Sequence, residues 1–143
     1  MRLEQDFASK IYDQVSTIYK QISTEYKEKK EAEKIYKRYG SMAYTLPILV
    51  RTAGLAQALA FVESKSKKDS NHPYTYLLNH LAEVVINNKN GSEFAKQSRE
   101  ADLQEYMYLT RRTMLALKWY KRFAESVLGI KSTDQIDDGG END

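Results

Sequence analysis

Cysteine is absent from the 143 residues of this chain. Its absence excludes disulfide bridges, zinc sites built from thiolates and cysteine nucleophiles, and it suits a reducing compartment. No apolar stretch follows the charged start MRLEQDF, so we expect no signal peptide and a cytoplasmic location. Uninterrupted apolar runs also stay far short of the roughly 20 residues that a membrane-spanning helix needs. The sequence therefore predicts a cytoplasmic protein that does not enter a membrane.

Signatures of catalysis are missing as well. The sequence has no glycine-rich phosphate loop, no nucleophile elbow and no pair of histidines at ligand spacing. His80 and Glu83 lie three residues apart, but a metal site in a helical bundle would need matching carboxylates on other helices. The carboxylates are expected on exposed, lysine-rich faces, where little would shift their pKa. We therefore expect a protein that is not an enzyme and that uses no metal ion and no cofactor.

Helical periodicity is the main positive signal. Near the N-terminus the apolar side chains recur every three or four residues, at Leu3, Phe7, Ile11, Val15, Ile18 and Ile22. Further helices are predicted to begin near Pro73, Ser92 and Asp102, and the last of them should end at about Gly129. The pattern predicts an all-α protein in which residues 1–130 form a single compact bundle of five or six helices.

The stretch from residue 45 to residue 65, TLPILVRTAGLAQALAFVESK, is the predicted centre of this bundle. A helix that is apolar on nearly all sides has to be buried on most of them. We expect one central rod with Thr45 as its cap, Pro47 in its first turn and Gly54 at a kink or a close helix approach. Arg51 should run its stem along the core, and its guanidinium should either pair with a glutamate or bind a phosphate.

Charged residues gather on both sides of this rod. Residues 24–38 read as an exposed helix ending at Gly40, and its basic side is either a solvated face or a phosphate-tracking stripe. Residues 131–143 hold one lysine and five acids, a net charge of −4, and are predicted to be a disordered acidic tail. Because the whole chain carries +2, residues 1–130 carry +6, which favours a polyanionic partner.

Two segments resemble a known family. The first, YGSMAYTLPILVRTAGLAQALAFVESK, holds a Leu-Pro pair, an internal arginine, Gly-Leu and Ala-Leu-Ala-Phe. The second, YMYLTRRTMLALKWYKRFAESVLG, holds a Tyr, a Thr-Arg turn and a Trp-x-Lys-Arg-Phe-Ala helix. In this sequence the matching residues are Leu46, Pro47, Arg51, Gly54, Leu55, Ala58, Leu59, Ala60, Phe61, Tyr108, Thr110, Arg111, Trp119, Lys121, Arg122, Phe123 and Ala124. Over residues 3–129 the chain resembles the small all-helical subunit of the type III-B CRISPR–Cas effector, the Cmr complex.

The resemblance implies a non-catalytic role in antiviral defence. Copies of such a subunit stack into a minor filament, which faces the backbone subunits that carry the guide RNA. They line the channel that holds the target RNA, while cleavage belongs to the backbone subunits and cyclic-oligoadenylate synthesis to the large subunit. The implied partners are therefore the backbone subunit, the large subunit, further copies of this chain, the target RNA and the guide RNA–target duplex.

Five cations are predicted to contact the target RNA: Arg51, Lys65, Arg111, Lys118 and Arg122. Four of them match family-like positions, and Lys118 is added because it shares a helix face with Arg111 and Arg122 at spacings i, i+7 and i+11. Such cations would follow the phosphate backbone without reading sequence. The alternative is a helical scaffold or adaptor that makes only protein contacts, with an exposed apolar patch and no continuous basic groove.

Overall fold

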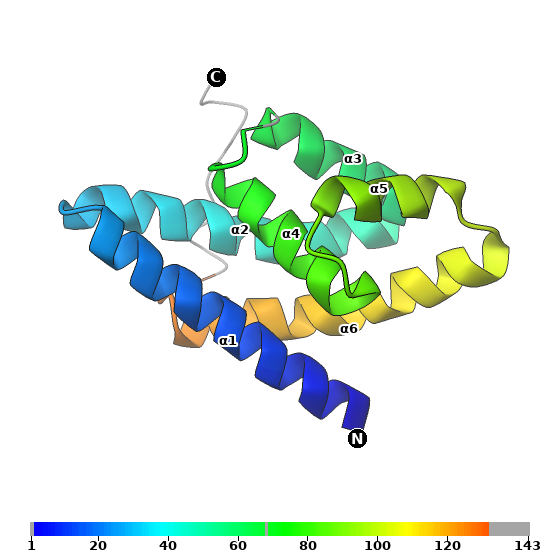
Figure 1. Ribbon diagram of the computed structural model, residues 1–143, viewed down its shortest axis with the longest axis horizontal. Coiled ribbons are helices and arrows are strands. Elements are labelled where there is room, and N and C mark those ends of the chain that lie inside the picture. Colours follow the sequence, from blue (N-terminus) through cyan, green and yellow to red (C-terminus); the bar gives the residue numbers. More distant parts are fainter. Residues whose placement is uncertain (1, 68, 132–143) are drawn as a thin grey trace.

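Six helices and no strand make up the part of the chain that the computed structural model describes, residues 2–67 and 69–131 (Figure 1). They are α1 (Arg2–Glu25), α2 (Lys29–Ala53), α3 (Leu55–Ser66), α4 (Pro73–Ile86), α5 (Gly91–Glu100) and α6 (Leu103–Ser126). The predicted all-α class and number of helices are confirmed. Residues 132–143 lie outside the described residues, so the disordered tail and the domain boundary after residue 130 stay predictions.

Helix α4 is the centre of the bundle. It packs against each of the other five helices, and Figure 1 shows it crossing the middle of the molecule. Its sequence explains this position, because apolar residues occupy more than one side of the helix. The buried ones are Pro73, Tyr74, Leu77, Leu78, Leu81, Ala82, Val84 and Val85. The bundle does have a central apolar helix, but α4 takes the place predicted for residues 45–65.

The predicted rod is not one helix. Gly54, with φ 91° and ψ 160°, separates α2 from α3, while Thr45 and Pro47 lie inside α2 rather than at a helix start. The hydroxyl of Tyr106 lies 3.0 Å from the position that a Cβ of Gly54 would take. The same hydroxyl accepts a hydrogen bond from the backbone N–H of Ala56, 3.0 Å away, in the first turn of α3. The close approach, one of the two alternatives predicted at Gly54, is therefore observed as the Tyr106 side chain of α6, whereas the chain breaks into two helices there instead of kinking within one.

The helix predicted to end at Gly40 continues through it, so that expectation is wrong. Gly40 is buried inside α2, and a Cβ added there would lie 2.9 Å from Cγ2 of Ile130. The hydroxyl of Tyr44 donates a hydrogen bond to the backbone oxygen of Ile130 over 3.2 Å. Gly40 thus makes room for the segment that follows α6, which is a packing role rather than a helix-ending one.

Helices α1 and α6 follow their sequence patterns. Five of the six apolar residues predicted on α1 are buried: Phe7, Ile11, Val15, Ile18 and Ile22. They pack most extensively against α6 rather than against the predicted rod. Helix α6 begins as predicted, because a side-chain oxygen of Asp102 accepts a hydrogen bond from the backbone N–H of Glu105 over 2.9 Å.

A polar network joins four helices inside the bundle. Gln14 on α1 donates to the backbone oxygen of His80 and to Oε1 of Glu83 on α4, each over 3.1 Å, and accepts from the hydroxyl of Tyr120 on α6. The hydroxyl of Tyr39 on α2 lies 2.8 Å from Nδ1 of His80. Burial raises the pKa of both tyrosines and lowers the pKa of His80 to about 4. His80 thus links α4 to α1 and α2 inside the bundle, which is a helix-packing role.

Candidate nucleic-acid interface

A hollow with a volume of about 280 Å³ lies between α2 and α6. Four of its lining side chains are cationic: Arg51 from α2 and Lys118, Lys121 and Arg122 from α6. The rest of the lining is apolar or aromatic apart from one carboxylate, and consists of Tyr44, Pro47, Met114 and Glu125. Four cations against one carboxylate give the hollow a positive potential, which suits an anionic ligand.

Arg51 lies at the rim of the hollow and is exposed. The expectation that its stem runs along the core is wrong, because the helix turns Leu46 and Val50 inward and places the next residue, Arg51, toward solvent. No ion pair of Arg51 is found among the residues that the structure describes, so the predicted glutamate partner is not observed. Its position in the last turn of α2 places the guanidinium favourably against the helix dipole.

The three cations predicted on α6 are all exposed, but they do not have the same surroundings. Lys118 and Arg122 line the hollow, whereas Arg111 does not. Nζ of Lys118 lies 2.7 Å from Oε2 of Glu4 on α1, and this lysine holds the pKa of the Glu4 carboxyl below its usual value. Because an exposed ion pair contributes little stability, an anionic ligand can replace Glu4 as the partner of Lys118. Lys118 can therefore still bind a ligand in the hollow.

Lys121 is the lining cation that was not among the five predicted residues. Its Nζ lies 5.7 Å from the centre of the Tyr44 ring, at the side of the hollow nearest the C-terminal segment. A usable sequence signal was present, because Met114, Lys118, Lys121 and Glu125 follow one another at spacings i, i+4, i+7 and i+11. These four residues therefore share the side of α6 that borders the hollow.

Lys65 lies apart from the hollow. It occupies the last turn of α3, where its Nζ lies 5.6 Å from the centre of the Phe61 ring. The structure thus brings three of the five predicted residues together, namely Arg51, Lys118 and Arg122. Arg111 lies on the same helix as two of them, and Lys65 lies on a helix that contributes nothing to the hollow.

Neighbouring residues on α6 have structural roles instead. The guanidinium carbon of Arg112 lies 5.0 Å from the centre of the Phe7 ring and 5.2 Å from that of Tyr108. Trp119 is half-buried, and its ring stacks on Phe123 with centroids 5.7 Å apart. Trp119 therefore belongs to the rim of the packed core.

The charged stretch at residues 24–38 forms the turn after α1 and the first part of α2. Its lysines at positions 27, 30, 34 and 37 are exposed, and so are the glutamates at positions 28, 31 and 33. None of these residues lines the hollow, which begins farther along α2 at Tyr44. The stretch is therefore an exposed charged surface that lies apart from the hollow.

Two other features, a metal site and a membrane-spanning helix, are absent from the part of the chain that the structure describes. Within residues 2–67 and 69–131, no group of three His, Cys, Asp or Glu side chains is arranged to hold a metal ion. Over the same described part of the chain, no helix is both long and apolar enough to cross a membrane. The four cationic side chains that line the hollow make it the candidate functional site for an anionic ligand.

The fold and the hollow together define a class: a small helical bundle that presents a cationic surface between two long helices. Residues 3–127 match the family described as CRISPR-associated protein (Cas_Cmr5). The "CRISPR system Cmr subunit Cmr5" of Thermus thermophilus is 44% identical over 90 residues, which span 63% of this chain and 75% of that relative. The chain belongs to the CRISPR-associated Cmr5 family.

A solved structure supports the same assignment. The crystal structure of a CRISPR-associated Cmr5 family protein from Thermus thermophilus is similar to this chain with a TM-score of 0.66 and 36% sequence identity. The similarity covers 87% of this chain and 96% of that one. The family resemblance drawn from the sequence is thereby confirmed.

Proposed function

We propose that this chain is the non-catalytic small subunit of a type III-B CRISPR effector, the Cmr complex, in the cytoplasm. In this role it stacks with further copies of itself in the minor filament and helps to hold the target RNA along the guide during antiviral defence. Membership of the Cmr5 family supports the assignment of this chain to the Cmr complex, since a relative of the chain is a Cmr subunit. Its partners would be the backbone subunit, the large subunit and the RNA strands.

The hollow between α2 and α6 is the observation that supports contact with RNA. Arg51 and Arg122 reach it from two different helices, so their separation is fixed by the packing of α2 on α6. Guanidinium groups can bind phosphate oxygens through paired hydrogen bonds without reading the bases. Sequence specificity would then come from pairing with the guide, as in other RNA-guided systems.

The remaining predicted cations fit this role unequally. Arg111 lies seven residues before Lys118 on the same helix, so a strand that leaves the hollow along α6 would pass it. Lys65 on α3 has no such continuity with the hollow. We therefore propose Arg51, Lys118, Lys121 and Arg122 as the main contacts, with Arg111 next and Lys65 last.

The alternative of a scaffold that makes only protein contacts predicted an exposed apolar patch and no basic groove. The structure has both kinds of surface, because apolar side chains such as Ile48, Phe61, Leu103 and Met107 are exposed in addition to the cationic hollow. Protein contacts and RNA contacts are therefore compatible in one chain, on different surfaces.

Charge reversal in a reconstituted effector tests the proposal. We expect Arg51→Glu combined with Arg122→Glu to lower target-RNA affinity by about tenfold or more, because each change removes an attraction and adds a repulsion. Lys34→Glu combined with Lys37→Glu is the matched control, since these exposed cations lie outside the hollow. Equal affinities for the two variants would contradict the proposed RNA contact.

A further inference from the structure

The cationic hollow lies beside the point where the chain leaves the bundle. The hydroxyl of Tyr44, which lines the hollow, donates a hydrogen bond to the backbone oxygen of Ile130 over 3.2 Å. Ile130 is buried, and its backbone N–H donates to the oxygen of Ala124 over 3.0 Å. The residues that follow Ile130 therefore start from a fixed position next to the hollow.

Those residues have the charge that the hollow lacks. We call residues 132–143 the acidic segment, because they hold five acids and no lysine, arginine or histidine: Asp134, Asp137, Asp138, Glu141 and Asp143. The hollow has four cationic side chains and one carboxylate, that of Glu125. Two opposite charges joined by a few residues of one chain have a high effective concentration for each other.

The acidic segment is long enough to cover the hollow. Tyr44 lies at the end of the hollow next to Ile130, and Arg51 lies seven residues farther along α2. Seven residues of helix measure about 10 Å. An extended chain spans up to about 3.5 Å per residue, so the acids from Asp134 onward can reach the whole length of the hollow.

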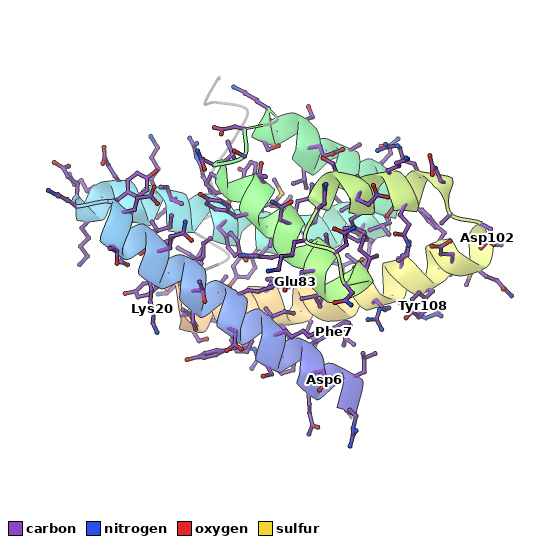
Figure 2. All side chains as sticks on the ribbon, viewed as in Figure 1. Asp6, Phe7, Lys20, Glu83, Asp102 and Tyr108 are labelled. Atoms are coloured by element: carbon purple, nitrogen blue, oxygen red, sulfur yellow. The ribbon has the colours of Figure 1, made fainter. Side chains whose placement is uncertain are left out.

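Carboxylates of the described chain leave most of this charge uncompensated. Nζ of Lys118 lies 2.7 Å from Oε2 of Glu4 on α1, in an exposed ion pair. Figure 2 shows Asp102 at the start of α6, whereas the hollow borders the second half of that helix. A segment with five carboxylates can contact several cations at once, and each contact after the first forms within an existing complex. It can therefore be held more firmly than the single carboxylate of Glu4.

The lysine-rich stretch at residues 27–38 is the other cationic surface near Ile130. Three exposed glutamates alternate with its exposed lysines, which lowers the positive potential along the stretch. In the hollow the cations converge from two helices, and Pro47 and Met114 supply apolar walls between them. Apolar walls concentrate the field of the charges that they enclose. The hollow is therefore the better site for the acidic segment.

We propose that the acidic segment lies across the cationic hollow and competes there with the phosphates of RNA. The identity of the competing ligand rests on the proposed function. Residues 1–130 carry +6, so an uncovered chain would attract any polyanion. A segment in the hollow keeps out weakly bound polyanions, whereas a target strand that is held by pairing with the guide displaces it.

A spin label shows where the acidic segment lies, independently of RNA. The sequence has no cysteine, so Gly139→Cys carries a single nitroxide and keeps all five acids. We expect the label to broaden the amide NMR signals of Arg51 and Met114 in the hollow. Lys34 in the lysine-rich stretch and Lys96 on α5 are the comparison sites and should keep their signals. In about 1 M salt, where the Debye length falls to about 3 Å, the selective broadening should disappear.

Two results of this experiment would overturn the proposal. One is broadening at Lys34 that equals or exceeds broadening at Arg51, which would place the segment on the lysine-rich stretch or nowhere in particular. The other is the absence of broadening at all four sites. The full chain is used without other subunits, so the result does not depend on assembly of the effector.

Replacing the five acids by amides should uncover the hollow. The changes are Asp134→Asn, Asp137→Asn, Asp138→Asn, Glu141→Gln and Asp143→Asn, which keep the length of the segment. A site that is covered about two-thirds of the time binds its ligand about threefold more weakly. We therefore expect target-RNA affinity of the reconstituted effector to rise about threefold when the amide segment replaces the acidic one.

A second background separates competition from the general effect of removing negative charge. Arg51→Gln, Lys121→Gln and Arg122→Gln remove the binding site of the segment, so the amide segment should raise affinity much less there. An equal rise in both backgrounds would overturn the competition. Selective broadening at Arg51, combined with hollow substitutions that leave RNA affinity unchanged, would mean that the proposed function has failed while the intramolecular contact stands.

Discussion

Tyr39 on α2 and His80 on α4 meet inside the bundle, with the tyrosine hydroxyl 2.8 Å from Nδ1 of the imidazole and the two rings at 67°. Gln14 extends this contact to α1 and, through Tyr120, to α6. The network therefore links the two helices that form the hollow, α2 and α6, to the central helix α4. Because α2 carries Arg51 and α6 carries Arg122, the network helps to set the distance between these two residues.

Lowering the pH should destabilise the folded state through protonation of His80. Burial lowers its pKa from 6.5 to about 4, so the folded state binds fewer protons than the unfolded state between these values. The stability that neutral His80 contributes to the folded state is fully present above about pH 6.5. It is lost as the pH falls toward 4, and the free energy of unfolding should decrease by up to about 3 kcal/mol. Urea unfolding at a series of pH values measures it. The drop over this range should shrink in His80→Gln and persist in His72→Gln; equal drops in both variants would rule out His80 as the source.

Gly40→Ala should destabilise the protein although alanine favours helices by up to about 1 kcal/mol. The added Cβ would lie 2.9 Å from Cγ2 of Ile130, and such overpacking typically costs about 1–3 kcal/mol. Thermal unfolding of a double-mutant cycle with Ile130→Ala checks the cause. The double variant should be more stable than the sum of the single effects predicts. Strict additivity would mean that the two residues do not compete for space.

Gly54→Ala and Gly129→Ala should differ although both glycines have a positive φ. Gly54 combines φ 91° with ψ 160° and has the Tyr106 hydroxyl 3.0 Å from a Cβ position, whereas Gly129 has φ 72° and nothing within 4 Å. We expect Gly54→Ala to lower the free energy of unfolding by about 1–3 kcal/mol and Gly129→Ala to lower it by less. Chemical denaturation compares them, and a larger cost at Gly129 would contradict the role given to the Gly54 break.

The ion pair between Lys118 and Glu4 should compete with RNA rather than support the fold. Glu4→Gln removes the carboxylate, so we expect unchanged thermal stability and target-RNA affinity that is equal or higher. Lys118→Gln also breaks the pair but removes the cation, so affinity should fall. Effector carrying each variant provides the comparison. An affinity loss in Glu4→Gln would show that the pair is needed to position Lys118.

Local signals explain what the sequence predicted well. The apolar spacing of α1 and the Asp102 cap of α6 depend on residues within one helix, and both predictions were confirmed. Gly40 shows where such reasoning stops, since a glycine that ends a helix and a glycine that admits a distant Ile130 look the same in sequence. Pro47 misled in the same way, because a proline typical of a first turn lies inside α2.

The cationic hollow could be predicted from the sequence only in part, because only some of its residues lie on one helix. Lys118 and Arg122 share a helix, so their common face follows from spacing alone. Arg51 reaches them only through the packing of α2 on α6, which no local pattern contains. The family resemblance supplied Arg51, while the side chains that lie beside it, including Lys121, became evident from the fold.

The salt dependence of target-RNA binding tests the central claim most directly. Effector with Arg51→Gln, Lys121→Gln and Arg122→Gln is compared with effector carrying Lys27→Gln, Lys30→Gln and Lys34→Gln, over a range of salt concentrations. Removing one cation that binds a phosphate of a single strand should flatten the slope of log affinity against log salt by about 0.7. The slope should therefore flatten by about 2 for each copy of the first variant that contacts the strand, and hardly at all in the second variant. Equal slopes in the two variants would contradict the assignment of the hollow between α2 and α6 as the RNA-binding site.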